Sequence, residues 1–427
     1  MTTASGEPTH MTTVYMFNQY ASYPGVPGST RHYNLARELV RQGIGVYIFS
    51  SNFSHMLKNR IRDVDGPYMI EEVDGVNYVR MNTFGYFHNN WRRVLNMADY
   101  ARKSYSIARD LARSGIVPDV VMGTVAHPFS VGSAHFTAKK LGARFFIDIG
   151  DLWPEVFVTS GKMTERHPVY VTVGKTMTYF YGKAEKIICL TDEARNYFKS
   201  RGYGDKTILL PPGIRLNGSP PCAPAPASGG SFRVVYAGSF QPIYPLDTVI
   251  KAARMLKDRG RDDVRFMLVG GGVQTDSLKS LAGGIGADNV EFIPPMPKGE
   301  LLEFLKTASA FVLIEKKASY GFPNKIIDYL SSGAPIIYAS PVRHAILGSG
   351  SCVEAPHDEA EGMADAILRV SSMSPEERNE MAECGTRFLK ENHDIELLAG
   401  RLIEHIRRPA QAGAIQTPGA LRREVPK

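Results

Sequence analysis

Short apolar runs alternate along the chain with segments whose apolar residues recur every three or four positions. The first run, at 12–17, is followed by a segment at 29–42 in which Leu35, Ala36 and Leu39 fall on one helical face. Short apolar runs suit strands that are buried on both faces, and the helical spacing suits helices that cover a sheet. The alternation therefore predicts the α/β class, with doubly wound parallel sheets.

The alternation continues through two parts of the chain. In the first part we expect strands at 12–17, 46–50, 119–122, 144–149 and 186–190, a hairpin at 70–81, and helices at 29–42, 130–141, 168–184 and 192–201. In the second part we expect strands at 232–237, 264–269, 290–293, 311–314, 335–339 and 351–354, and helices at 246–259, 299–307, 323–332, 359–370, 375–390 and 395–407. Two Rossmann-like domains of this kind would face a central cleft at the carboxyl ends of their strands, where such sheets bind ligands.

A segment rich in Pro, Ala, Gly and Ser, LNGSPPCAPAPASGGS, separates the two parts and cannot build a core, so it predicts a linker. The predicted organisation is a disordered tail (1–11), a first, acceptor-binding domain (12–215), the linker (216–231), a second, donor-binding domain (232–394), a helix that returns to the first domain (395–408) and a second disordered tail (409–427).

Composition narrows the class of protein. The chain has 427 residues, 43% of them hydrophobic, and a formal net charge of +7. This mild positive charge suits phosphorylated or anionic-lipid partners, and without a dense Lys/Arg cluster no nucleic-acid partner is predicted. The four cysteines lie far apart, which predicts neither a disulfide framework nor a zinc site. No apolar stretch reaches the ~18 residues of a membrane span, so we expect a cytoplasmic protein, soluble or peripheral on the inner face of the membrane.

The segment EKKASYGFPNKIIDYLSSGAP, at 315–335, carries the clearest candidate chemistry. Pro323 and Gly333 are residue types favoured at the start of a helix and just past its end. The N-terminus of such a helix, with Lys325 beside it and Asp328 one turn further on, suits a phosphorylated ligand whose other end carries hydroxyl groups. An ion pair between Asp328 and Lys325 on the helix surface is the alternative.

The order of the short motifs resembles the retaining, nucleotide-sugar-dependent glycosyltransferases of family 4, which have the two-domain GT-B fold. The motifs are GVPGSTRHYNLARELVRQGIGVYIFSS (25–51), DIGDLWPEVF (148–157), LPPGI (210–214), YAGSF (236–240), LVGGG (268–272), NVEFIPPMPKGELLEFL (289–305) and FPNKIIDYLSSGAP (322–335). The DLWP stretch and the Pro-Asn-Lys helix start are similar to bacterial N-acetylfucosaminyl transferases of surface-polysaccharide biosynthesis. The resemblance implies a nucleotide-sugar donor, a glycan or lipid-diphosphate acceptor, and neither a metal nor another cofactor.

The resemblance places the donor in the second domain. Asp328 falls where the family has the second glutamate of its Glu-x7-Glu pair, which accepts hydrogen bonds from the nucleotide ribose. The other residues that the resemblance places around the donor are Gly238, Ser239, Gly271, Gly272, Met296, Phe322, Pro323 and Asn324.

Two positions depart from the pattern of the family. Tyr320 stands where the family has the first glutamate, which contacts the donor sugar. The run at 239–244 lacks the Arg and Lys that clamp the diphosphate in many relatives. Because negative charge develops on the leaving diphosphate, we expect Lys317 or Lys316, together with Lys325, to supply the cation. Ordinary solvated lysines are the alternative, favoured for Lys316.

Candidate acceptor residues lie at strand ends in the first domain. Asp151 is expected to orient an acceptor hydroxyl or act as a base, and a structural cap of the turn that follows it is the competing interpretation. Gly28 and Arg31 open the first helix, where an acceptor or phosphate can approach, although a flexible loop explains them equally well. His127 also ends a strand, but a lone His before Pro is more often a hydrogen-bonded loop residue.

The segment at 84–103 interleaves aromatic residues with Arg92, Arg93, Arg102 and Lys103. This pattern predicts either contact with an anionic membrane surface or a helix that packs on its own domain, and both can hold for different faces. The Asp-Val-Asp sequence at 63–65 matches a metal-binding motif only in its letters.

The predicted function is the transfer of a hexosyl or N-acetylhexosaminyl group from a nucleotide-diphosphate sugar, UDP before GDP, with retention. The expected acceptor is a polysaccharide or a lipid-linked oligosaccharide precursor. A GT-B nucleotide-sugar epimerase, a phosphorylase and a non-catalytic scaffold that binds nucleotide sugars are the alternatives. The two departures from the pattern of the family keep the scaffold open.

Overall fold

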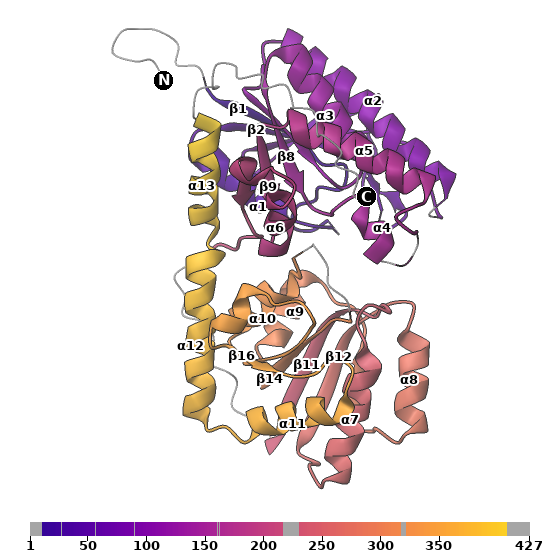
Figure 1. The fold of residues 1–427 in the computed structure, drawn as a ribbon, viewed down its shortest axis with the longest axis vertical. Coiled ribbons are helices and arrows are strands. Elements are labelled where there is room, and N and C mark those ends of the chain that lie inside the picture. The colour runs from indigo at the N-terminus through magenta and orange to yellow at the C-terminus, as the bar shows by residue number, and fades with distance from the viewer. Residues whose placement is uncertain are drawn as a thin grey trace, which may run out of the picture.

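The computed structural model describes residues 11–26, 28–55, 57–88, 90–159, 161, 163–216, 230–316 and 322–407. Two α/β domains lie one above the other in the view of Figure 1, and the helices α12 (Pro375–Asn392) and α13 (Ile395–Arg407) run along one side of both. Each domain is built on its own sheet. The predicted α/β class with two doubly wound sheets is therefore confirmed.

The sheet of the first domain has the strand order β10-β9-β8-β7-β1-β2-β6-β5. Its strands are β1 (Thr13–Phe17), β2 (Gly45–Ser51), β5 (Tyr68–Val73), β6 (Val76–Met81), β7 (Val120–Thr124), β8 (Arg144–Ile149), β9 (Lys186–Cys189) and β10 (Thr207–Leu209). Neighbouring strands are parallel except β5 and β6, which form the predicted hairpin. The strands β3 (Phe53–Ser54) and β4 (Asn59–Arg60) form a separate antiparallel pair.

The sheet of the first domain is covered on both faces. Its helices are α1 (Arg31–Arg41), α2 (Trp91–Arg113), α3 (Pro128–Leu141), α4 (Glu155–Thr159), α5 (Pro168–Lys183) and α6 (Asp192–Lys199), with the 3-10 turn η1 (Gly204–Lys206). One apolar core joins the sheet to α2, α3 and α5, and another joins it to α1 and α13. The central strands β1 and β7 are buried at every position, as expected where both faces of a sheet are covered, whereas the edge strand β5 is only partly buried.

The sheet of the second domain is entirely parallel, in the order β13-β12-β11-β14-β15-β16. Its strands are β11 (Phe232–Ser239), β12 (Val264–Gly271), β13 (Val290–Ile293), β14 (Ala310–Ile314), β15 (Ile336–Ala339) and β16 (Cys352–Glu354). Its helices are α7 (Leu246–Asp258), α8 (Thr275–Gly284), α9 (Lys298–Leu305), α10 (Lys325–Ser332), α11 (Ala360–Ser371) and α12, with the 3-10 turn η3 (Ala345–Gly348).

Several elements differ from the predicted pattern. The helix α8 was not expected, because only Leu278 and Ala282 of it are buried, which is too few for a clear helical period. The helix α4 and the strand β10 are likewise too short to show one. The helix α10 begins at Lys325 rather than at residue 323, although it ends at Gly333 as predicted, where φ is +78°.

The chain returns to the first domain at its carboxyl end. Leu398, Leu402 and Ile406 of α13 are buried in the core that contains α1. The Arg144 guanidinium donates hydrogen bonds to the carbonyl oxygens of His405 and Ile406, both at 2.8 Å, and so satisfies the last turn of the helix. Beside the crossing point, the backbone of Ile214 pairs with that of Asp394. The two segments in which the chain passes between the domains, at Ile214 and at Asp394, therefore lie side by side.

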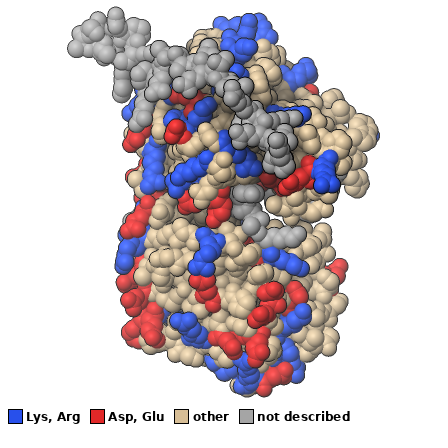
Figure 2. Space-filling model, in the orientation of Figure 1, with Lys and Arg blue, Asp and Glu red and all other residues tan. Residues whose placement is uncertain are grey.

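Charges are mixed on the face drawn in Figure 2. Blue and red atoms are interspersed on both domains, and the described part of this face shows no continuous basic stripe. A protein that binds along a nucleic-acid backbone needs such a stripe. Among the described helices, none combines the length and the apolar character needed to cross a bilayer.

Candidate functional site

A pocket of about 250 Å³ lies at the carboxyl ends of β11 and β12, where ligands of such sheets bind. The residues that line it are Ala237, Gly238, Ser239, Val269, Gly270, Gly271, Pro295, Met296 and Leu301. Four of the predicted donor residues, Gly238, Ser239, Gly271 and Met296, are thus brought together in one cavity. We refer to this cavity as the strand-end pocket.

Two glycines let the strand ends approach each other closely. A Cβ atom on Gly270, whose φ is +141°, would lie 1.9 Å from the carbonyl oxygen of Gly238. No side chain fits there, so the wall of the pocket is bare backbone. Gly272 lies just outside, where an added Cβ would meet the carbonyl oxygen of Phe240 at 2.5 Å. Gly272 is therefore needed for close packing of the backbone, and its donor role stays a prediction.

Lys325, at the start of α10, points its ammonium group toward the strand-end pocket. The Nζ atom lies 3.9 Å from the ring centroid of Tyr244 and 4.5 Å from that of Tyr236. It donates a hydrogen bond to Tyr236 Oη at 3.2 Å, and it would lie 3.3 Å from a Cβ atom on Gly238. The aromatic faces attract the cation electrostatically. A positive charge is therefore fixed beside the backbone of Gly238.

The surroundings of Lys325 shift its acidity. Removal from water lowers the pKa of Lys325 to about 8, although the carboxylate of Glu315 acts in the opposite direction. Glu315 is buried at the end of β14, and burial raises its pKa, while Lys325 and the hydroxyl of Ser340 lower it. The two side chains therefore compensate each other electrostatically, and Lys325 carries its charge at neutral pH.

Asp328 pairs with a lysine that the sequence pattern did not indicate. Its carboxylate lies 2.6 Å from the Nζ atom of Lys298, at the start of α9, and not beside Lys325. The alternative of an ion pair between Asp328 and Lys325 is therefore wrong. Burial raises the pKa of Asp328, while Lys298 lowers it. Lys298 has 60% of its side chain exposed, so it can move away when a ligand reaches Asp328.

Three other predicted donor residues, Phe322, Pro323 and Asn324, precede α10 and do not line the strand-end pocket. Phe322 lies between the domains, with its ring 5.0 Å from that of His393, in a hollow of about 80 Å³. Asn324 is exposed next to α10, and Pro323 is half-buried.

Lys317 and Tyr320 lie outside the described residues, so the structure does not place the second proposed cation. Lys316 is exposed.

Arg31 belongs to a buried ion pair in the first domain. Its Nη1 atom lies 2.8 Å from Oδ2 of Asp148 at the end of β8, and His32 Nε2 lies 3.0 Å from the same oxygen. Asp148 has 1% of its side chain exposed. Burial raises its pKa, but Arg31 and His32 together hold it well below the usual range. Arg31 also donates to the carbonyl oxygen of Leu210, so its predicted contact with an acceptor competes with structural bonds.

His127 is completely buried before α3. Its Nδ1 atom accepts a hydrogen bond from the amide of Ser130 at 3.2 Å and caps the helix. Its Nε2 atom donates to the side-chain oxygen of Gln19 at 2.6 Å. Burial lowers the pKa of His127 to about 3, which keeps the ring neutral. A direct contact with an acceptor would require Gln19 or α3 to move.

Gly28 lies in the loop before α1, where its φ is +147° and an added Cβ would lie 2.8 Å from that of Ser22. The loop therefore needs a glycine for its shape, whatever approaches it. The predicted acceptor role of Gly28 stays a prediction.

Asp151 follows β8 and is exposed. Its carboxylate accepts no hydrogen bond from any residue that the structure describes, which argues against a capping role. Neighbouring protein atoms exclude part of the water around the carboxyl group of Asp151 and so raise its pKa, whereas the nearby charge of Arg93 lowers it. The side chain is therefore available to a hydroxyl group of a ligand. Within the described ranges, no three His, Cys, Asp or Glu side chains lie close enough to hold a metal ion.

Comparison with known proteins agrees with this geometry. Residues 28–217 match a family model described as Glycosyltransferase Family 4, and residues 231–372 match one described as Glycosyl transferases group 1. The two matches together cover most of the chain, and its fold is that of the GT-B glycosyltransferases. The first match covers the domain of Asp151, and the second covers the strand-end pocket, Lys325 and Asp328.

The individual relatives are distant. A D-inositol 3-phosphate glycosyltransferase of Streptomyces avermitilis is 28% identical over 203 residues, which are 42% of this chain and 42% of the relative. The chain thus spans less than half the length of that relative. A sucrose-phosphate synthase from Thermosynechococcus elongatus superposes with a TM-score of 0.72 at 16% identity, over 93% of this chain and 98% of the other. An Anabaena protein, HepE, solved with UDP, superposes with a TM-score of 0.67 at 12% identity, over 93% and 99%.

Proposed function

We propose that the protein transfers a sugar from a UDP sugar to a lipid-linked or polysaccharide precursor, with retention of the anomeric configuration. The sugar is of the hexosyl or N-acetylhexosaminyl type, with N-acetylfucosamine as the first candidate from the motif pattern. The observation that carries the proposal is the convergence of Lys325, Asp328 and the bare backbone of Gly238 at one end of the second sheet. The UDP bound to HepE, at the same fold, favours UDP as the nucleotide.

In this proposal each residue has one task. Asp328 accepts hydrogen bonds from the ribose hydroxyls after Lys298 moves away. Lys325 neutralises the charge that develops on the diphosphate as the bond between C1 of the sugar and the phosphate oxygen breaks. The acceptor oxygen forms its new bond to C1 on the same face, and its proton passes to an oxygen of the leaving phosphate. Asp151 orients the acceptor hydroxyl from the first domain.

Replacing Asp328 tests the ribose contact. Because a hydrogen bond to a charged group contributes ~1.5–3 kcal/mol, we expect Asp328→Ala to weaken UDP binding by roughly tenfold to a hundredfold. Isothermal titration calorimetry with UDP measures this change. Lys298→Met removes the same ion pair but keeps the carboxylate, so it should bind UDP at least as tightly as the wild type. An unchanged affinity of Asp328→Ala would exclude the ribose role.

The pH dependence tests the charge on Lys325. An ammonium group is charged below its pKa, and the pKa of Lys325 is lowered to about 8. We therefore expect kcat/KM to fall as the pH rises through about 8. A bound diphosphate raises the pKa of a neighbouring ammonium, so the fall in kcat should lie at higher pH. Lys325→Arg should lose this alkaline limb, and a profile that is identical in both proteins would contradict the assignment.

A phosphorylated polyol is the second candidate acceptor, because the similar Streptomyces protein is named for D-inositol 3-phosphate. Incubation with a panel of UDP and GDP sugars, with either extracted membrane lipid or inositol phosphate, followed by mass analysis, separates the two acceptors. UDP binding without transfer to either would favour a non-catalytic scaffold, and conversion of the donor alone would favour an epimerase. Absence of nucleotide binding would exclude the transferase.

A further inference from the structure

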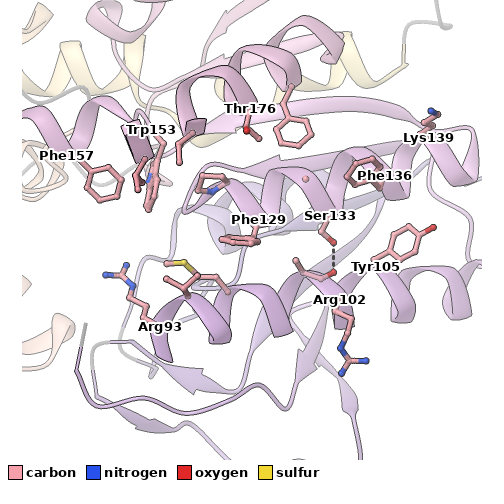
Figure 3. Close-up of a pocket in the computed structure, with 18 of the residues that line it drawn as sticks. Arg93, Arg102, Tyr105, Phe129, Ser133, Phe136, Lys139, Trp153, Phe157 and Thr176 are labelled. Atoms are coloured by element: carbon pink, nitrogen blue, oxygen red, sulfur yellow. Dashed lines mark hydrogen bonds between the residues drawn. The ribbon is translucent and has the colours of Figure 1, made fainter. Parts of the chain in front are cut away.

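A long apolar groove crosses the helical face of the first domain (Figure 3). It has a volume of about 1290 Å³ and runs between α2, α3 and α5. This is larger than the ~300–1,000 Å³ of most small-ligand pockets. The side chains that form its apolar wall include Val94, Met97, Phe129, Phe136, Trp153 and Phe157. Several of them are substantially exposed, for example Phe136 at 53% and Val94 at 50%.

The charged side chains that line the groove, among the described residues, are all basic. Arg93, Arg102, Lys139 and Lys140 line it, and no carboxylate does so among the described residues. In Figure 3, Arg93 lies at the end where Trp153 and Phe157 lie, whereas Arg102, Tyr105 and Lys139 lie toward the other end. The guanidinium of Arg102 points away from the groove and pairs with Asp99 at 3.4 Å. An apolar groove with a cation at one end is complementary to a hydrocarbon chain with an anionic head.

One end of the groove lies near the proposed acceptor residue Asp151. Trp153, which lines the groove, lies two residues beyond Asp151, and the charge of Arg93, which also lines it, lowers the pKa of Asp151 against the opposing effect of burial. The end of the groove at Arg93 therefore opens beside the group that we assign to the acceptor hydroxyl. A head group held at Arg93 would bring the attached sugar or phosphate to Asp151.

We propose that this groove binds the single hydrocarbon chain of a lipid-diphosphate acceptor, with the diphosphate at Arg93. The proposal rests on the proposed function, because it names the class of acceptor. A flat membrane-binding face would expose its apolar side chains outward without a cavity, whereas here α2, α3 and α5 form the walls of an open groove. The exposed Phe84, Phe87 and Trp91 lie next to the start of α2 and supply a path from a membrane into the groove.

Two variants alter the groove without entering the core. Thr176 is an exposed groove residue of α5, so Thr176→Trp narrows the groove. Phe136→Glu places a carboxylate in its apolar wall. Val117→Glu is the matched control, because Val117 is an exposed apolar residue of the same domain, at 44%, and does not line the groove.

The test is binding of geranylgeranyl diphosphate below its micelle concentration, measured by calorimetry with the full chain. We expect the wild type and Val117→Glu to bind it at least tenfold more tightly than inorganic diphosphate, because the chain buries apolar surface. Thr176→Trp and Phe136→Glu should each lose about tenfold or more, since the first narrows the groove and the second replaces apolar contact surface with a charged side chain. A neutral alkyl maltoside should bind more weakly than the diphosphate.

Several outcomes would overturn the proposal. Equal affinity for the isoprenoid and inorganic diphosphate, or an affinity that neither groove variant changes, would exclude chain binding. Binding to phosphatidylglycerol vesicles alone would make the face a membrane surface. UDP binding, measured in parallel, should be unchanged in every variant because the strand-end pocket lies in the other domain. A protein that binds UDP but no lipid would refute the groove alone, and one that binds lipid but no UDP would refute the transferase.

Discussion

Lys325→Met is expected to lower kcat by roughly a hundredfold to a thousandfold. Loss of one preorganised group that stabilises developing negative charge costs ~2.7–4 kcal/mol of transition-state stabilisation. Lys325 is the cation fixed beside Gly238, held between the rings of Tyr236 and Tyr244. Because it acts on charge that appears during bond cleavage, kcat should fall more than the affinity for the donor. Release of UDP from the preferred UDP sugar measures kcat.

Two further variants isolate the charge from the packing. Lys325→Arg keeps a cation between the same rings, so it should retain part of the activity that Lys325→Met loses. Lys251→Met removes a lysine of α7 that pairs with Asp247 at 2.9 Å on the surface, and should leave kcat unchanged. If Lys325→Met folds, binds UDP and turns over within tenfold of the wild type, another group neutralises the diphosphate.

The fold was predictable because its signal is local. Strands buried on both faces read as apolar runs, and the helices that cover them show a helical period, so the sequence predicted both sheets and the hairpin β5–β6. The helix α8 escaped because it buries only Leu278 and Ala282. The end of α10 was predicted from Gly333, whereas its start, predicted at Pro323, lies at Lys325.

The donor site was predictable only in part. The glycines and Met296 follow strand ends, and strand ends of a parallel sheet meet at one edge, so their convergence followed from topology. Lys298 could not be foreseen as the partner of Asp328, because the two residues lie on different helices. The contact between Lys325 and Tyr244 is of the same kind. Pairs distant in sequence are fixed by packing, and no periodicity reports them.

The groove also could not be predicted from the sequence pattern. The segment at 84–103 showed aromatic residues among cations, and the structure separates them: Met97 and Tyr100 are buried, whereas Trp91, Val94 and Leu95 are exposed. Whether exposed apolar residues form a flat face or a groove depends on how far α2, α3 and α5 stand apart. That spacing results from the three-dimensional packing of side chains such as Phe180.

Arg31→Ala is expected to lower the free energy of unfolding by about 3 kcal/mol. Removing one partner of a buried ion pair typically costs ~3–5 kcal/mol because the other charge stays buried without compensation. The remaining partner, Asp148, is buried, and among the described residues only His32 would still contact its carboxylate, at 3.0 Å. This remaining contact places the effect at the low end of the range. For a domain of this size the melting temperature should fall by roughly 6–12 °C, which calorimetry measures.

The matched control for this change is an exposed ion pair. Arg113 lies 2.8 Å from Asp110, with 67% and 50% of the two side chains exposed, so Arg113→Ala should cost no more than ~1 kcal/mol. The pH adds a second readout. Because the folded-state pKa of Asp148 is held below its unfolded value, its contribution is complete above the unfolded value of ~3.9 and is lost as the pH falls further. The difference between Arg31→Ala and the wild type should therefore be full at pH 7 and shrink below about pH 4. If both arginine variants melt alike at pH 7, Arg31 is free to serve the acceptor, as the sequence first suggested.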